Sequence, residues 1–186
     1  TGMSAEDLGP LDWEPPDREL AAAGALAAGR VAGPHDWRTA AVVGTGPVAE
    51  AATAQLSKVG ATLAEPRYDA ACDVLFVAGK AGVLDHPTAA VVQARTIVPL
   101  TPVPVTARAF AVLRRSDRVV IPDFLSTAAP LLARFDAEGG DPVQRVHRAC
   151  SELAEHGTGM WLAAAQRAEA FLATWTDEKP FGRPLA

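Results

Sequence analysis

The sequence is poor in the residues that mark several functional classes. Its two cysteines, Cys72 and Cys150, lie far apart and lack the spacing of metal ligands. Free thiols in a reducing compartment are the favoured interpretation, and a disulfide is the alternative. Only three of the 186 residues are lysines, no basic cluster is interleaved with aromatic residues, and the net charge is −5. This composition argues against nucleic acid as a partner.

Long hydrophobic runs are also missing. No segment is apolar enough over about 18 residues to cross a bilayer, and no secretory signal pattern is present. We therefore expect a cytoplasmic protein without a membrane partner. The length and the ordinary apolar content, 49%, suit one compact domain with a sizeable core.

The most informative motif is a glycine-rich turn after a short apolar run. Residues 39–43 form a mainly apolar run, Gly44-Thr45-Gly46-Pro47-Val48-Ala49 follows, and an alanine-rich helical pattern continues to residue 58. The first glycine permits a tight turn, and the second lets the backbone approach phosphate oxygens. The free N–H groups at the helix amino end would hold the phosphates. The motif predicts binding of a dinucleotide pyrophosphate, as in NAD or NADP.

Strand-like and helical patterns alternate along the rest of the chain. Strands are expected at 39–43, 61–65, 73–79, 96–100 and 118–123, and helices at 17–29, 47–58, 86–94, 106–115, 142–155 and 158–174. This order predicts an α/β fold, a three-layer Rossmann-type domain with a reduced, mainly parallel sheet. We expect an irregular leader at 1–16, one domain at 17–176 and a tail at 177–186.

One connection is too short for an ordinary doubly wound sheet. Only residues 66–72 separate the second expected strand from the third, whereas a parallel crossover usually takes a dozen or more. The sequence therefore predicts a trimmed sheet with a reduced adenosine side. Glu65 is the only acid near the end of the second strand. It could hold a ribose hydroxyl, and a plain surface charge is an equally supported interpretation.

Five ordered segments resemble the cofactor domain of the glutamate, leucine, phenylalanine and valine dehydrogenases. Residues 44–49 resemble that family's Gly-x-Gly-Asn-Val-Gly/Ala turn, and 55–61 resemble its helix end and Gly-Ala strand entry. Residues 72–75 resemble its Cys-Asp-Ile strand, 121–129 its Pro-Asp-Phe/Tyr-x-x-Asn-Ala-Gly-Gly segment, and 157–169 its last helix. The resemblance covers most of residues 17–172 and implies NAD(P) binding.

The chain also departs from the family pattern. The family carries a separate substrate domain with a catalytic lysine and aspartate, and we expect no such domain here. Thr127 stands where the resemblance implies an asparagine, Pro102 where it implies a ribose-holding asparagine, and Pro47 where it implies the turn asparagine. Proline suits a first helical position but removes one N–H donor from the phosphate cradle.

Further candidates follow from where ligands bind in such sheets, beyond the carboxyl ends of the strands. We expect Ala78, Gly79, Thr101 and Thr127 to bind the cofactor together with the glycine turn. Lys80 and Asp123 are the candidate catalytic pair, since a lysine in an apolar cleft can act as a base or nucleophile. The alternative is that Lys80 extends into water and Asp123 caps a helix.

Three hypotheses follow. The first is an NAD(P)-binding oxidoreductase or cofactor subunit that takes its catalytic residues from another chain. The second is a repurposed scaffold performing non-redox chemistry on a small amino-acid-like or keto-acid-like metabolite, with Lys80, Thr101, Asp123 and Thr127 lining the cleft. The third is a non-catalytic assembly partner that uses the surface around the last helix, where Trp161, Phe171 and Trp175 recur at helical spacing. A homo-oligomer or a partner protein is expected in each case.

Overall fold

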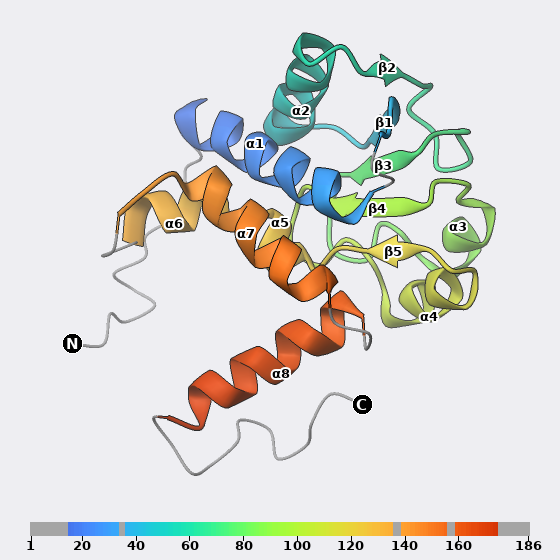
Figure 1. Ribbon diagram of the computed structural model, residues 1–186. Coiled ribbons are helices and arrows are strands. Elements are labelled where there is room, and N and C mark those ends of the chain that lie inside the picture. The colour runs from blue at the N-terminus through green and yellow to red at the C-terminus, as the bar shows by residue number, and fades with distance from the viewer. Residues whose placement is uncertain (1–14, 34–35, 136–138, 156–158, 175–186) are drawn as a thin grey trace.

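The computed structural model describes residues 15–33, 36–135, 139–155 and 159–174. Nearly all of the expected leader, the whole expected tail, and Trp175 lie outside these ranges. Figure 1 shows a parallel sheet between two layers of helices.

The sheet has five parallel strands: β1 (Thr39–Val43), β2 (Thr62–Leu63), β3 (Val74–Val77), β4 (Thr96–Pro99) and β5 (Val119–Val120). Their order across the sheet is β2-β1-β3-β4-β5. The chain runs from β1 outward to β2, and then returns to build the other half from β3. The strand order thus reverses between β1 and β3, which is the position where open α/β sheets bind ligands. The predicted α/β, Rossmann-type fold is confirmed.

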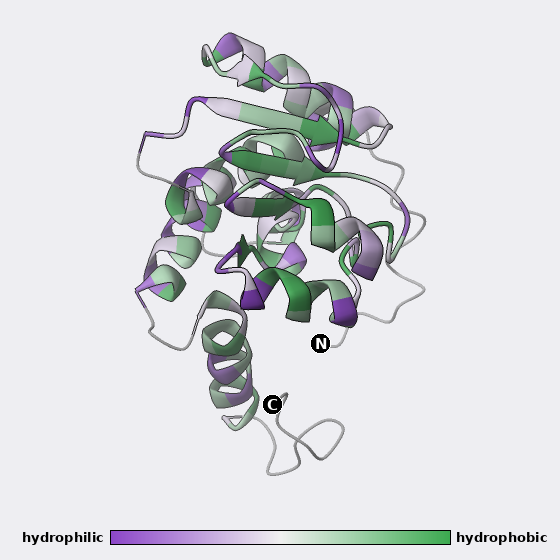
Figure 2. Ribbon diagram, turned by 90° about the vertical axis from the view of Figure 1, so that its right-hand side faces the viewer, coloured by the Kyte–Doolittle hydropathy of each residue, from purple (hydrophilic) through white to green (hydrophobic). Residues whose placement is uncertain are grey.

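Alternate strand residues enter two separate cores. On one face, Val42, Phe76 and Val98 pack against helices α1 (Pro15–Ala32), α2 (Pro47–Lys58), α7 (Pro142–Ala154) and α8 (Met160–Leu172). On the other, Leu75 and Ile97 pack against α3 (His86–Val91) and α4 (Ala107–Arg115). This alternation is the two-residue period of a strand buried on both faces. The strands accordingly appear among the most apolar segments in Figure 2.

The short connection crosses β1 without a helix, as expected. Ala64 N–H donates to Ala40 O over 2.8 Å, and nine residues later Asp73 N–H donates to Thr39 O over 3.1 Å. Between them, Tyr68 and Ala70 pack on the face that α3 and α4 cover. The connection therefore takes the place of a helical layer on this side of β1.

The two cysteines lie on opposite faces of the sheet. Cys150 is fully buried in α7, whereas Cys72 is half-buried on the face of α3 and α4. Both are free thiols. The disulfide alternative is therefore wrong, because the sheet separates the two sulfur atoms.

Two short helices follow β5, α5 (Asp123–Ser126) and α6 (Ala129–Phe135). The sequence pattern does not predict a helix at 129–135, because seven residues with Pro130 near the start are too few to show a helical period. Packing against α1 sets the position of α6. A Cβ added at Gly24 of α1 would lie 2.8 Å from Cβ of Ala129 in α6. The small residues of α1 thus let α6 approach closely.

Candidate functional site

The glycine turn forms the centre of the candidate site. Gly44 and Gly46 have φ angles of 106° and 113°, which side chains of L-residues rarely tolerate. A Cβ added to Gly44 would lie 2.0 Å from Ala78 O, so the turn passes directly against the end of β3. Ala78 N–H also donates to Val43 O over 2.8 Å. The turn therefore has the conformation and the support that its glycines predict.

Two backbone N–H groups close to Gly46 have no hydrogen-bond acceptor among the described residues. The first backbone bond of α2 runs from Glu50 N–H to Gly46 O at 3.0 Å. Within the described part of the chain, the N–H groups of Val48 and Ala49 donate to nothing, and Pro47 has no N–H. A Cβ added at Gly46 would meet no atom within 4 Å. Two free donors and the positive end of a helix thus face open space, an arrangement suited to an anion.

A cavity of about 300 Å³ lies on one side of this turn, which we name the α6 cavity. It is lined by Asp17, Thr45, Gly46, Pro47, Val48, Ala49, Ala78, Leu100, Thr101, Pro102, Thr127, Pro130, Leu131 and Arg134. Most of this lining is apolar. Two hydroxyl groups in the lining donate hydrogen bonds to backbone carbonyl groups. Thr101 Oγ donates to Gly79 O over 2.8 Å, and Thr127 Oγ donates to Asp123 O over 2.8 Å.

The charged groups of the α6 cavity form one ion pair. Arg134, in the last turn of α6, donates to the Asp17 carboxylate in the first turn of α1. Asp17 is the more buried partner, with 14% of its side chain exposed against 39% for Arg134. Only one of the five guanidinium N–H groups is used by a described residue. The pair therefore leaves donors available at the cavity wall.

A wider hollow of about 610 Å³ lies on the other side of the turn, which we name the β2 hollow. Its walls are the glycine turn, part of α2, Leu63 at the end of β2, and Ala64 and Pro66 after it. Among the described residues, Glu50 is the one charged residue in its lining. Thr45, Gly46 and Ala49 border both spaces. The α6 cavity and the β2 hollow therefore meet at the free donors of α2.

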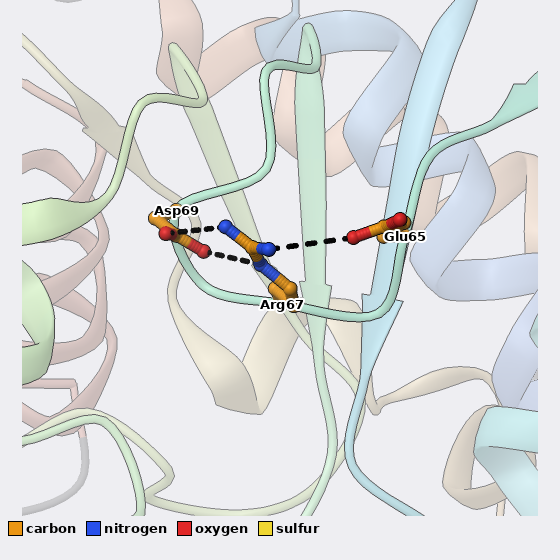
Figure 3. A network of polar contacts seen from close by, with 3 residues as sticks. All are labelled: Glu65, Arg67 and Asp69. Atoms are coloured by element: carbon orange, nitrogen blue, oxygen red, sulfur yellow. Dashed lines mark hydrogen bonds and ion pairs between the residues drawn. The ribbon is translucent and has the colours of Figure 1, made fainter.

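Glu65 stands in sequence between Ala64 and Pro66, which line the β2 hollow, but it is not part of that lining. Its carboxylate contacts Arg67 Nη1 at 3.5 Å (Figure 3). Arg67 binds Asp69 more closely, with Nε to Oδ1 at 2.9 Å and Nη2 to Oδ2 at 2.7 Å. The Arg67 hydrogen bond holds the pKa of the Asp69 carboxyl below its ordinary value. The three side chains form one acidic group with a net charge of −1.

The candidate catalytic pair lies outside the α6 cavity lining. Lys80 is exposed in the turn after β3, and no described residue forms an ion pair with it. Asp123 Oδ2 accepts a hydrogen bond from Val103 N–H at 2.8 Å. Val103 has a φ of 51°, so this contact supports a strained loop after β4. Of the four residues expected to line the cleft for non-redox chemistry, Thr101 and Thr127 do so.

Most of the expected cofactor-binding residues come together. Thr45, Gly46, Pro47, Val48, Ala78, Thr101 and Thr127 line the α6 cavity, and Gly44 lines the β2 hollow. Gly79 is bonded to Thr101 Oγ beside the cavity. No element was expected over residues 129–135, so Arg134 was not among the expected site residues. The first helix was expected to begin at Asp17, but α1 begins two residues earlier and holds Asp17 in its first turn.

Among the described residues, no helix combines the length and the apolar character needed to cross a membrane. No three His, Cys, Asp or Glu side chains in these ranges gather as a metal ion would require.

Comparison with solved structures identifies the fold. The hetero-hexameric glutamate dehydrogenase from Thermus thermophilus, in its Leu-bound form, is 21% identical with a TM-score of 0.62, covering 87% of this chain and 54% of that one. The L-tryptophan dehydrogenase from Nostoc punctiforme is 16% identical with a TM-score of 0.55, over 84% and 56% of the two chains. A further glutamate dehydrogenase is 15% identical with a TM-score of 0.65, over 87% and 55%.

The chain has a Rossmann-type α/β fold, similar to part of each of these structures. It spans about half the length of the solved structures that it matches. At these identities the likeness is one of fold. No family model matches the sequence, and no curated protein matches it.

Proposed function

We propose that this chain is a dinucleotide-binding domain of an oxidoreductase related to the amino-acid dehydrogenases. One observation carries the proposal: two hollows meet at the glycine turn, where Val48 and Ala49 present free N–H donors. An extended dinucleotide needs a cradle for its pyrophosphate with room for a nucleoside on each side. Two solved structures of similar fold are a glutamate dehydrogenase and an L-tryptophan dehydrogenase, which supports this assignment.

Each part of NAD(P) would have its own place at the glycine turn and in the two hollows beside it. The pyrophosphate would lie on the amino end of α2, the nicotinamide half in the α6 cavity, and the adenosine half in the β2 hollow. Their volumes, about 300 and 610 Å³, fall in the range typical of small-molecule sites. The apolar walls of the α6 cavity would exclude water from the nicotinamide ring.

The bound cofactor would supply the hydride chemistry, and this chain would hold and orient it. Within the described residues, the α6 cavity offers no free acid or base, because Asp17 is committed to Arg134. We therefore propose that a second copy or a partner protein supplies the groups that move protons.

Paired glycine variants test the proposal. Gly46 and Gly60 lie at opposite ends of α2, both have positive φ, and a Cβ at either would meet no atom within 4 Å. Both variants therefore place a β-branched side chain at a positive φ without a steric clash, but only Gly46→Val intrudes on the pyrophosphate position. In calorimetric titration with NAD(H) and NADP(H), we expect Gly46→Val to weaken binding by about tenfold or more. Gly60→Val should leave the affinity unchanged. Silence of the parent protein at millimolar nucleotide, or equal effects of the two variants, would overturn the proposal.

A second candidate function rests on the Asp17–Arg134 pair. An ion pair in an apolar wall is complementary to a zwitterion, whose carboxylate would bind Arg134 and whose ammonium would bind Asp17. The α6 cavity would then be a non-redox site for an amino-acid-like metabolite. Titration with leucine, its 2-oxo acid and isopentylamine in the absence of nucleotide separates this candidate from the first. Tight binding of leucine alone would favour it, and no binding of any of the three would reject it.

A further inference from the structure

A separate cavity, of about 140 Å³, lies where helix α4, strand β5 and the start of α8 meet (Figure 1). We name it the α8 cavity. It shares no lining residue with the α6 cavity or the β2 hollow. Its volume is below the range of about 300 to 1,000 Å³ that is usual for sites holding a whole small molecule. The α8 cavity therefore suits a small ligand, or one group of a larger ligand.

The lining of the α8 cavity is positively charged, although the chain as a whole has a net charge of −5. Arg114 and Arg118 both line the cavity, and none of the described acidic residues does so. Within the described part of the chain, neither guanidinium forms an ion pair with a carboxylate. Two cations without a counter-charge repel each other across a small cavity, and an anion between them would offset that repulsion.

Both arginines are held in place and still have donors available. Arg118 Nη1 donates to Gln93 O over 3.0 Å and to Ala94 O over 3.2 Å, and no described residue uses its Nε or Nη2. The Arg114 guanidinium lies 6.0 Å from the centroid of the Phe110 ring. This cation–π contact positions Arg114 without using its N–H groups. The donors of both side chains can therefore bind a ligand.

The indole of Trp161, which also lines the α8 cavity, indicates that an acceptor belongs there. Its ring packs edge-on against Phe110 and Phe124, with centroid distances of 5.3 and 5.6 Å. Trp161 Nε1 is buried and has no hydrogen-bond acceptor in the structure. Buried donors are nearly always paired in folded proteins, and an unpaired one lowers stability. A ligand oxygen would supply the missing acceptor.

We propose that the α8 cavity binds an oxyanion, the phosphate or carboxylate group of a small metabolite. Arg114 and Arg118 bind its oxygen atoms through charge-assisted hydrogen bonds. Trp161 Nε1 donates a further hydrogen bond once Phe124, which is 52% exposed, turns aside. The amino end of α8 lines the same cavity and adds the positive end of the helix dipole. The inference is independent of the proposed dinucleotide function, because the two sites share no lining residue.

The test uses the indole N–H resonance of Trp161 in NMR spectra of ¹⁵N-labelled protein. Trp161→Phe identifies this resonance by its absence. Inorganic phosphate and acetate are the two probes, each titrated at constant ionic strength against chloride. Arg114→Gln removes one cation from the lining, and Arg115→Gln is the matched control, since Arg115 is exposed on the same helix but does not line the cavity. Because the resonance reports locally, phosphate bound at the glycine turn does not imitate the effect.

We expect at least one probe to shift the Trp161 resonance saturably, with a Kd of about 10 mM or lower. The probe that binds more tightly identifies the group that the cavity accepts. Arg114→Gln should weaken this binding by about fivefold or more, and Arg115→Gln should leave it unchanged. Absence of a saturable shift with both probes up to about 100 mM would overturn the proposal. Equal weakening by the two arginine variants would also overturn it, because the effect would then come from net charge alone.

Discussion

Asp17 and Arg134 form an ion pair across 117 positions of the sequence, joining the first turn of α1 to the last turn of α6. The pair closes the wall of the α6 cavity, which lies between these helices and the glycine turn. Close packing of α1 and α6 around Gly24 and Ala129 supports the same arrangement. Both charges are thus held beside the site by a contact that forms only in the folded chain.

Replacing Arg134 should affect ligand binding more than folding. Because Arg134 is partly exposed, the pair contributes about 1 kcal/mol or less to stability. Arg134→Gln should therefore change the melting temperature little but weaken NAD(H) binding about fivefold. It removes the one cation that the described residues contribute to the α6 cavity lining. Thermal denaturation and calorimetric titration measure the two effects. A large loss of stability with unchanged affinity would show that Arg134 serves only the fold.

The two glycines of the turn should respond differently to alanine. A Cβ at Gly44 would meet Ala78 O at 2.0 Å, whereas a Cβ at Gly46 would meet nothing within 4 Å. Both substitutions carry the strain of a positive φ. We expect Gly44→Ala to lower the free energy of unfolding by about 3 kcal/mol or more, and Gly46→Ala by about 1 kcal/mol. Urea denaturation distinguishes them, and equal losses would contradict the close contact with β3.

Asp73 should make stability depend on acid pH. Its Oδ2 accepts from the backbone N–H and hydroxyl of Thr39 and from Arg38 N–H, at 2.7 to 3.0 Å. These hydrogen bonds lower the pKa of Asp73, and the two from Thr39 have the largest effect. A lowered folded-state pKa means that the stabilisation is complete above the unfolded pKa and is lost as the pH falls from about 4 through the folded value.

Asp73→Ala provides the measurement. It should cost about 1–2 kcal/mol at neutral pH and make the unfolding free energy less dependent on pH below about 4. Denaturation curves at several pH values, compared with the parent protein, show both effects. If the unfolding free energy of Asp73→Ala and that of the parent protein change with pH in parallel, other carboxylates cause the acid sensitivity.

Asp123→Ala should loosen the loop after β4. Its carboxylate holds Val103, which has an unfavourable positive φ. Loss of the bond should cost about 1–2 kcal/mol. Adding Val103→Gly should recover part of that loss, because glycine accepts the left-handed conformation. If the double variant is no more stable than Asp123→Ala, the bond does not restrain this loop.

The buried thiol should report on unfolding. Burial raises the pKa of Cys150 to about 11, so its thiolate is scarce near pH 8. We expect an alkylating reagent to modify Cys150 only at the rate of global unfolding, and the half-buried Cys72 earlier. Mass spectrometry of partly labelled protein checks the order. Early labelling of Cys150 would indicate local opening of α7.

The glycine turn and the strands beside it could be predicted because their signals are local. Gly44 and Gly46 stand between a buried apolar run and an amphipathic helix, so their role follows from steric freedom and spacing. The missing helix between β2 and β3 was also predictable, since seven residues cannot form a helical crossover. Helix α6 was not, because its seven residues form a helix only through packing against α1 and α7.

The sequence by itself determined the order of the elements, the parallel sheet and the place of the turn, since each depends on neighbouring residues. Only the tertiary structure decided which charges share a site. It brought Asp17 to Arg134, tied Asp123 to Val103, and left Lys80 outside the α6 cavity. The reason is physical: side chains distant in sequence meet only after the helices have packed, and the small residues of α1 set how closely they do so.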